Sequence, residues 1–158
     1  MNVKGQAALE YMLTYGWAIL VIMIVGLALW QMGLFNPPNP TPGCHGFSQI
    51  TVLDQKLNIS ASNGILTLVL SNDGGATMEI QSGGIDASIF DMDCSCSSGC
   101  SADPFRPGQT LRTTLTCNNL AATYTSGDYY RAYINITYTN KASGITHTSS
   151  GVCWGTIE

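Results

Sequence analysis

The sequence predicts an α+β protein, in which a long hydrophobic N-terminal α-helix is followed by an antiparallel, Ig-like β-sandwich head that disulfides stabilise. Three observations lead to this prediction. The segment from Tyr11 to Phe35 contains no charged residue, a proline-rich stretch follows it, and the rest of the chain alternates apolar with polar residues between turn signals. With 158 residues the chain is long enough for one domain but too short for two full ones.

The composition narrows the class of protein. Only 10% of the residues are charged, against roughly 25% in an ordinary soluble domain, and the formal net charge is −4. These values argue against a basic nucleic-acid-binding surface, a disordered acidic chain and a typical cytosolic enzyme. The even count of 6 cysteines indicates an oxidising compartment, and therefore a head outside the cytoplasm.

The first element expected is a hydrophobic helix over residues 6–35. Its uncharged part, from Tyr11 to Phe35, would be about 37 Å long, enough to cross a bilayer. Because this part is apolar on all sides, it must be buried in lipid or among other helices. Lys4 is the only basic residue before it and the next is Lys56, so the preference of basic residues for the cytoplasmic side places the N-terminus inside and the rest outside.

The next segment, residues 36–43, is expected to be a semi-rigid linker, because its four prolines cannot continue a helix. The head then spans residues 44–158. We expect about seven to nine short strands where residues alternate with a period of two. The clearest are residues 64–70, 110–117 and 129–138, with turn signals at Asn72-Asp73-Gly74-Gly75, Ser82-Gly83-Gly84, Pro107-Gly108 and Ser126-Gly127-Asp128.

The N-terminus carries the most specific pattern in the chain. A short basic leader ends in Gly5, Gln6 follows, and Glu10 lies at the membrane boundary, where a carboxylate is costly unless it is solvated or paired. No small-residue cleavage site of a secretory signal peptide follows the apolar run. This arrangement resembles the archaeal type IV pilin family, whose members carry a class III signal peptide. Gln6 and Glu10 match the family's motif, whereas Ala8 stands where serine is usual and Thr14 where leucine is usual.

The resemblance implies a structural subunit of an adhesive pilus. A prepilin peptidase would remove residues 1–5 by cutting between Gly5 and Gln6. The helices of many copies would then polymerise into the filament core, with Glu10 paired to the new amine of Gln6 in a neighbouring copy. An assembly ATPase and a membrane platform protein would also be needed. The archaellins share the processing route, but they lack a glutamate at the position of Glu10, so the resemblance favours a pilus over a swimming filament.

Other functions are compatible with the same segments. The chain could be a monomeric membrane-anchored extracellular binding module, for example for sugars, or a minor or tip pilin. His45 and His147 stand in no catalytic motif, so we expect neither an enzyme nor a cofactor. The tyrosines of the C-terminal half are expected to be strand residues, some of them on an adhesive surface: Tyr124, Tyr129, Tyr130, Tyr133 and Tyr138.

The cysteines are expected to form disulfides rather than a metal site. The short spacing from Cys94 through Cys96 to Cys100 could suggest a metal cluster, but no histidine lies near it and no matching pair accompanies it. Cys94 and Cys96 should not pair with each other, because alternate residues of a strand are poorly placed for a disulfide. The sequence leaves the pairing open among Cys44, Cys94, Cys96, Cys100, Cys117 and Cys153.

Two further features are candidate modification or binding sites. Asn58 and Asn135 begin N-glycosylation sequons, and both are expected on the outward face of a strand. Four aspartates around the cysteine loop could suggest a calcium site, although they lack the spacing of an EF-hand and are expected to lie in a solvated loop: Asp86, Asp91, Asp93 and Asp103.

Overall fold

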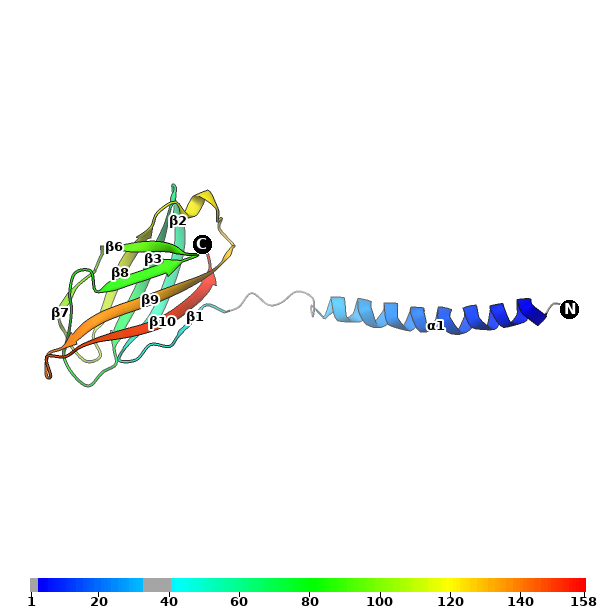
Figure 1. Cartoon of the computed structure of the whole chain (residues 1–158), viewed down its shortest axis with the longest axis horizontal. Coiled ribbons are helices and arrows are strands. Elements are labelled where there is room, and N and C mark those ends of the chain that lie inside the picture. The colour runs from blue at the N-terminus through cyan, green and yellow to red at the C-terminus, as the bar shows by residue number, and fades with distance from the viewer. Residues whose placement is uncertain (1–2, 33–40) are drawn as a thin grey trace. The chain divides into compact units, whose positions relative to one another are not determined.

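The computed structural model of the chain describes residues 3–32 and 41–158, which belong to two separate units, residues 1–40 and residues 41–158. The first unit contains α1, a helix over Val3–Gln31, and the second contains the β-rich head (Figure 1). The coarse prediction of an apolar N-terminal helix followed by an antiparallel, disulfide-bonded head is therefore confirmed.

The helix begins earlier than expected. It starts at Val3 instead of Gln6, because neither Val3 nor Lys4 stops a helix and a single glycine at Gly5 costs only about 1 kcal/mol. Its last turn closes where the Met32 amide donates to the carbonyl of Ala28, 3.0 Å away. The expected helix end at Phe35, the linker residues 36–40 and the first two residues of the expected leader lie outside the described residues.

The head begins at Thr41, three residues before the expected start at Cys44. Its first strand, β1 (Gly43–His45), pairs antiparallel with the last strand, β10 (Thr146–Thr156). The Trp154 indole lies over Gly43, where a Cβ would come within 3.0 Å of the ring, and its Nε1 donates to the carbonyl of Thr41 at 3.0 Å. Residues 41–43, expected in the linker, are thus part of the head.

The described part of the head contains ten strands, against the seven to nine expected. Besides β1 and β10 they are β2 (Ile50–Ser60), β3 (Asn63–Asn72), β4 (Met78–Ile80), β5 (Ile85–Ile89), β6 (Met92–Ser98), β7 (Ala102–Phe105), β8 (Thr110–Cys117) and β9 (Tyr129–Asn140). A short 3₁₀ turn spans Leu120–Ala122. Strands β1, β4 and β7 have only three or four residues, too few to show a period of two in the sequence.

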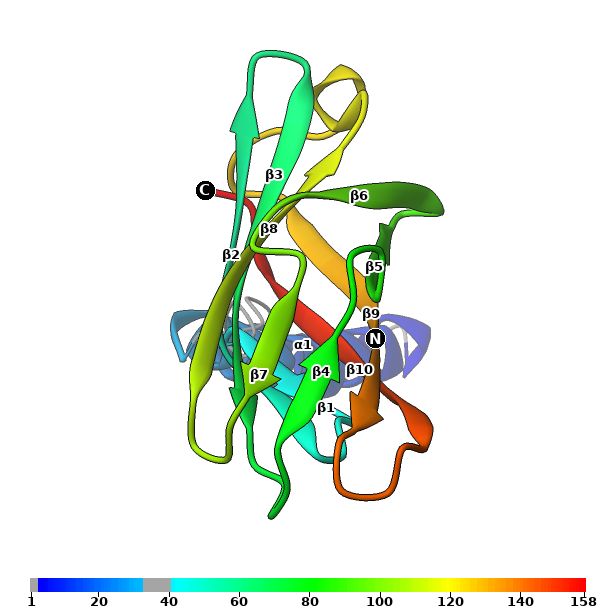
Figure 2. The ribbon, with the colours of Figure 1, turned by 90° about the vertical axis from the view of Figure 1, so that its left-hand side faces the viewer.

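All these strands belong to one antiparallel sheet with the order β1-β10-β9-β5-β6-β8-β3-β2, and β4 adds to β9 and β7 off this path. The sheet curls into a barrel-like body (Figure 2). The Ig-like arrangement of two separate sheets stays a prediction. The predicted buried faces are confirmed, since Leu66, Leu68 and Leu70 of β3 and Ala132, Ile134, Ile136 and Tyr138 of β9 all lie in the core.

Side chains join the two ends of the strand order. Gln55 of β2 donates from Nε2 to the carbonyl of Gly43 at 3.1 Å and to that of Trp154 at 2.7 Å. Buried Ser149 of β10 donates to the carbonyl of Ile50 at 2.8 Å and accepts the amide of Ser48 at 2.9 Å. This seam, made by Gln55 and Ser149, links β2 to β1 and β10 where no backbone ladder runs.

Tyr130 of β9 makes the stability of the head sensitive to alkaline pH. It is 2% exposed, and burial, with a smaller effect of the Glu158 carboxylate, raises the pKa of its phenol to about 12. Above the ordinary pKa of about 10 the unfolded chain loses this proton while the folded chain keeps it, so stability falls as pH rises. We expect Tyr130 to account for a loss of about 1 kcal/mol of unfolding free energy between pH 9 and pH 11.

Urea denaturation of the parent chain and of Tyr130→Phe at both pH values checks this expectation. The phenylalanine variant should lose less stability than the parent, whereas Tyr129→Phe, at an exposed position next to it on the same strand, should lose as much as the parent. An equal loss in all three proteins would show that the Tyr130 phenol does not control this pH dependence.

Candidate functional site

The described part of α1 from Glu10 onward is a long apolar helix. The segment Glu10–Gln31 has a mean hydropathy of 2.3 and is long and apolar enough to cross a membrane, and its large side chains are mostly exposed, for example Trp17 at 68% and Trp30 at 71%. A core helix of a soluble protein would bury one face against its own domain. The length and composition of this helix are compatible with a membrane anchor or with a signal sequence.

Polar side chains lie at the N-terminal end of this segment. Glu10, Tyr11, Thr14, Tyr15 and Ala18 line a shallow hollow on the helix surface. The Thr14 hydroxyl donates to the backbone carbonyl of Glu10 at 2.8 Å, and the rings of Tyr11 and Tyr15 lie 4.8 Å apart. The Thr14 hydroxyl is thus satisfied within the helix itself.

The Glu10 carboxylate takes part in no ion pair or side-chain hydrogen bond within the described residues. Gly5 and Gln6, the expected processing residues, lie in the first two turns of α1, where helix amides have no carbonyl partner one turn earlier. Gln6 and Glu10 are four residues apart and therefore lie on the same side of the helix, one turn from each other. A charge in an apolar helix requires a partner or water, and the described part of the chain supplies no partner.

The six cysteines form three disulfides, which leaves no free thiol among the described residues. Cys44–Cys153 joins β1 to β10, and Cys94–Cys117 joins β6 to β8, in both cases between residues directly opposite each other. Cys96–Cys100 closes a short loop after β6. The expectation that Cys94 and Cys96 do not pair with each other is confirmed.

The two sequons differ in their surroundings. Asn135 lies on the outer face of β9 and is exposed, with buried Ile134 and Ile136 on either side. Asn58 of β2 is half-buried, and it stands opposite Ile65 of β3. Asn58 also lines a polar groove of about 450 Å³ together with Asp54, Lys56 and Arg112.

The four aspartates do not form a common site. Asp86, Asp91 and Asp93 are exposed on β5, on the turn after it and on β6, whereas Asp103 on β7 pairs with Lys141. Within residues 3–32 and 41–158, no group of three or more histidine, cysteine, aspartate or glutamate residues is placed to hold a metal ion. The histidines are separate: His45 packs edge-on against Trp154 with the ring centres 5.1 Å apart, and His147 lies 5.7 Å from Tyr138.

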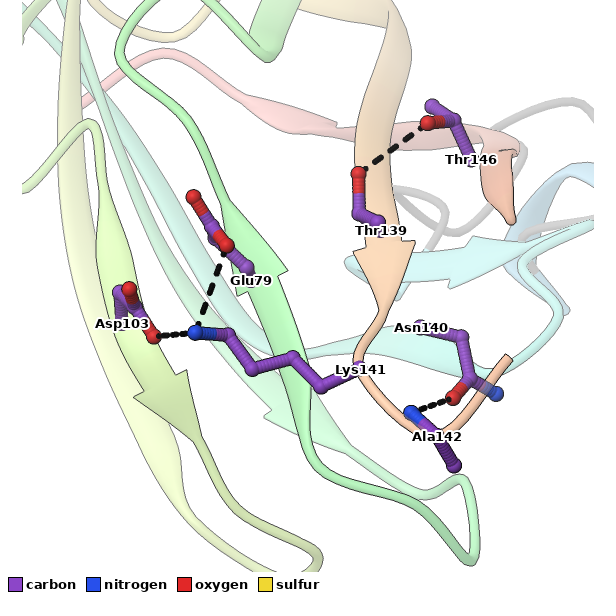
Figure 3. A network of polar contacts seen from close by, with 7 residues as sticks. All are labelled: Glu79, Asp103, Thr139, Asn140, Lys141, Ala142 and Thr146. Atoms are coloured by element: carbon purple, nitrogen blue, oxygen red, sulfur yellow. Dashed lines mark hydrogen bonds and ion pairs between the residues drawn. The ribbon is translucent and has the colours of Figure 1, made fainter. Parts of the chain in front are cut away.

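Lys141, just after β9, connects three elements that are distant in the sequence (Figure 3). Its Nζ lies 2.5 Å from Asp103 Oδ1 and 3.4 Å from Glu79 Oε2, so that it bridges β7 and β4. The hydrogen bond to Asp103 is the main cause that raises the pKa of Lys141 above its usual value. Because Lys141 and Asp103 are 39% and 49% exposed, this network, which joins the residue after β9 to β4 and β7, adds little to stability.

Comparison with known proteins gives no family for the chain. No protein-family model matches it, and no curated protein matches it. Among solved structures it is similar to ycdA, a candidate lipoprotein from Bacillus subtilis, with 11% sequence identity and a TM-score of 0.40. The match covers 72% of this chain and 38% of that chain, so this chain spans well under half the length of that protein. A similarity this low supports no inference about function.

Sequence reasoning missed the Lys141 network and the contacts of Trp154. Lys141, Glu79 and Asp103 come from separate hairpins, and no local spacing connects them. The Trp154 contacts with Gly43 and Thr41 depend on the pairing of the first strand with the last. The sequence places Asp103 in an acidic group but does not show that Lys141 lies next to it in the fold.

Proposed function

We propose that the chain is a structural subunit of an archaeal type IV-like adhesive pilus that polymerises through α1, with the head on the outside of the filament. One observation carries the proposal: a helix with an apolar surface on every side is exposed along its described length and carries a single charged group, Glu10, in the segment Glu10–Gln31. The resemblance of the first residues to class III signal peptides supports the same function.

Packing between helices replaces lipid in this proposal. Outside the membrane each helix packs against other helices, and this avoids the cost of exposing its surface to water, roughly 25 cal/mol per Å² of apolar area. Such packing has no preferred register along an evenly apolar helix. An ion pair between Glu10 and the Gln6 amine of a neighbour would fix the register, which is the best-attested role of buried charge pairs.

Processing at Gly5 and Gln6 supplies that amine. A prepilin peptidase cuts the peptide bond between them on the cytoplasmic side, and the assembly ATPase and platform protein then move the subunit out of the membrane. The bond lies near the start of α1, where few helical hydrogen bonds hold the backbone. Opening one turn therefore exposes the bond to the peptidase at low energetic cost.

The experiment that tests the proposal is mass spectrometry of the mature N-terminus of protein sheared from the cell surface. A chain that starts at Gln6 and keeps the apolar helix supports the prepilin route. A retained Met1 would favour a monomeric membrane-anchored binding module, because α1 alone is long enough to cross a bilayer. A cut beyond Gln31 would indicate a conventional signal peptide and remove the basis for polymerisation. The copy number of the chain in purified filaments separates a major subunit from a minor or tip pilin.

A further inference from the structure

The outer face of β9 places an aromatic ring beside the Asn135 sequon. Tyr133, Asn135 and Thr137 alternate with buried residues and therefore share this face, and Tyr133 is 52% exposed. Residues two positions apart in a strand are separated by roughly 6.7 Å. The first sugar attached to the Asn135 side chain would thus lie within reach of the Tyr133 ring.

The neighbouring strands leave this area open and polar. Directly opposite Asn135 stand Ser150 of β10 and Asp86 of β5, both exposed. Opposite Tyr133 stand Val152 and Ser88, and about half of the Tyr133 side chain is exposed. An aromatic ring packs against the C–H face of a sugar, while carboxylate and hydroxyl groups bind sugar hydroxyls. The surroundings of Asn135 provide all three groups.

We propose that Asn135 carries an N-linked glycan whose first sugar packs against the Tyr133 ring, so that the glycan lies along the outer face of β9 and β10. Tyr133 is then a positioning residue for the glycan. The inference requires the head to lie outside the cytoplasm, as in the proposed function, but it does not require polymerisation.

The covalent step is a group transfer without oxidation or reduction. The donor is an oligosaccharide linked through phosphate to a membrane lipid, and a membrane oligosaccharyltransferase is the catalyst. A bond forms between the Asn135 amide nitrogen and C1 of the first sugar, and the bond between C1 and the phosphate oxygen breaks. The lipid phosphate leaves with the electron pair, and a base of the transferase takes up the amide proton.

The other sequon provides an internal comparison. Along β2 the same-face neighbours of Asn58 are Lys56 and Ser60, and the residue opposite is Ile65, so no aromatic ring adjoins it there. A glycan on Asn58 would lack the contact that we infer for Asn135. Removing the Asn58 sequon with Ser60→Ala should therefore leave the melting temperature of the head within about 1 °C.

The test uses the full chain, extracted in detergent from an archaeal host that N-glycosylates its surface proteins. Mass spectrometry of the peptide that contains Asn135 should show a glycan. Asn135→Gln should lower the melting temperature of the head by about 2–4 °C, and the same substitution in a Tyr133→Leu background should lower it by under about 1 °C. Leucine keeps an apolar side chain but removes the ring. Tyr129→Leu, also exposed on this face but six residues from Asn135, is the matched control and should keep the full effect of Asn135→Gln.

An unmodified Asn135 peptide would overturn the inference, as would an equal effect of Asn135→Gln in the Tyr133→Leu background. Thr137→Ala destroys the sequon but keeps the asparagine, and it should reproduce the result of Asn135→Gln. This variant separates the loss of the glycan from the loss of the Asn135 side chain. A glycan on Asn135 in a chain that retains Met1 would support this inference and contradict the pilus proposal, so the two can fail separately.

Discussion

Replacing Glu10 with alanine should lower the yield of sheared filaments by about tenfold or more, while the amount of chain in the membrane and the melting temperature of the head stay unchanged. In the proposed filament core, the Glu10 carboxylate pairs with the Gln6 amine of a neighbouring copy, and the substitution leaves that amine without its partner. Breaking a buried ion pair by removing one partner costs about 3–5 kcal/mol, because the other charge is left uncompensated. The head is a separate unit, so its stability should not respond.

Two further variants make the Glu10 measurement specific. Glu10→Gln keeps the size of the side chain but loses the charge, and it should fail to assemble as Glu10→Ala does. Thr14→Ala removes the hydroxyl that donates to the Glu10 carbonyl without changing a charge, and it should assemble normally. Filament yield is measured by gel densitometry of the sheared fraction against total membrane protein. Normal yield from Glu10→Ala would rule out a pairing role for the carboxylate.

Removing the Cys44–Cys153 disulfide should lower the unfolding free energy of the head by about 5 kcal/mol, and it should be the most damaging of the three single-disulfide deletions. This bond joins residues 109 positions apart, so it restricts the unfolded chain far more than Cys96–Cys100, which joins residues 4 apart. The chain-entropy relation gives only about 2 kcal/mol for the short loop.

Double alanine variants at each pair of cysteines, compared by guanidinium denaturation, measure this ranking. The pair Cys96 and Cys100 is the matched control, since its removal deletes the same chemical groups from a half-buried loop. A head that loses as much stability from the short loop as from Cys44–Cys153 would show that local packing, not the length of the closed loop, determines the contribution of each disulfide.

The sequence predicted those parts of the fold that depend on local periodicity. The alternation in β3 and β9 identified their buried faces, since a period of two is visible in strands of ten residues or more. The charge-free segment identified α1 by its length and its uniformly apolar composition. Strands β1, β4 and β7 could not be found, because three or four residues carry no period and these strands exist only through pairing with distant partners.

The candidate site residues likewise fall into two groups: those that the local sequence indicates and those that depend on strand pairing. Glu10 and Gln6 can be proposed from the sequence because motif and helix register are both local, and Asn135 can be proposed because its sequon and its face of β9 are local. The disulfide pairing depends on strand register, which places Cys94 opposite Cys117 and Cys44 opposite Cys153, and six cysteines alone do not fix it. The same holds for Lys141, whose carboxylate partners lie on β4 and β7.

The pairing of the first strand of the head with the last has a consequence for the order of folding during export. If the head leaves the cytoplasm N-terminus first, β1 is delivered before its partner β10, and Cys44 meets Cys153 only when nearly the whole chain has crossed the membrane. Contacts of such long sequence separation form late, because the entropy of closing the loop must be overcome first. In that case the head would complete its fold only after translocation, and the chain would stay unfolded enough to pass through an export channel until its last residues emerge.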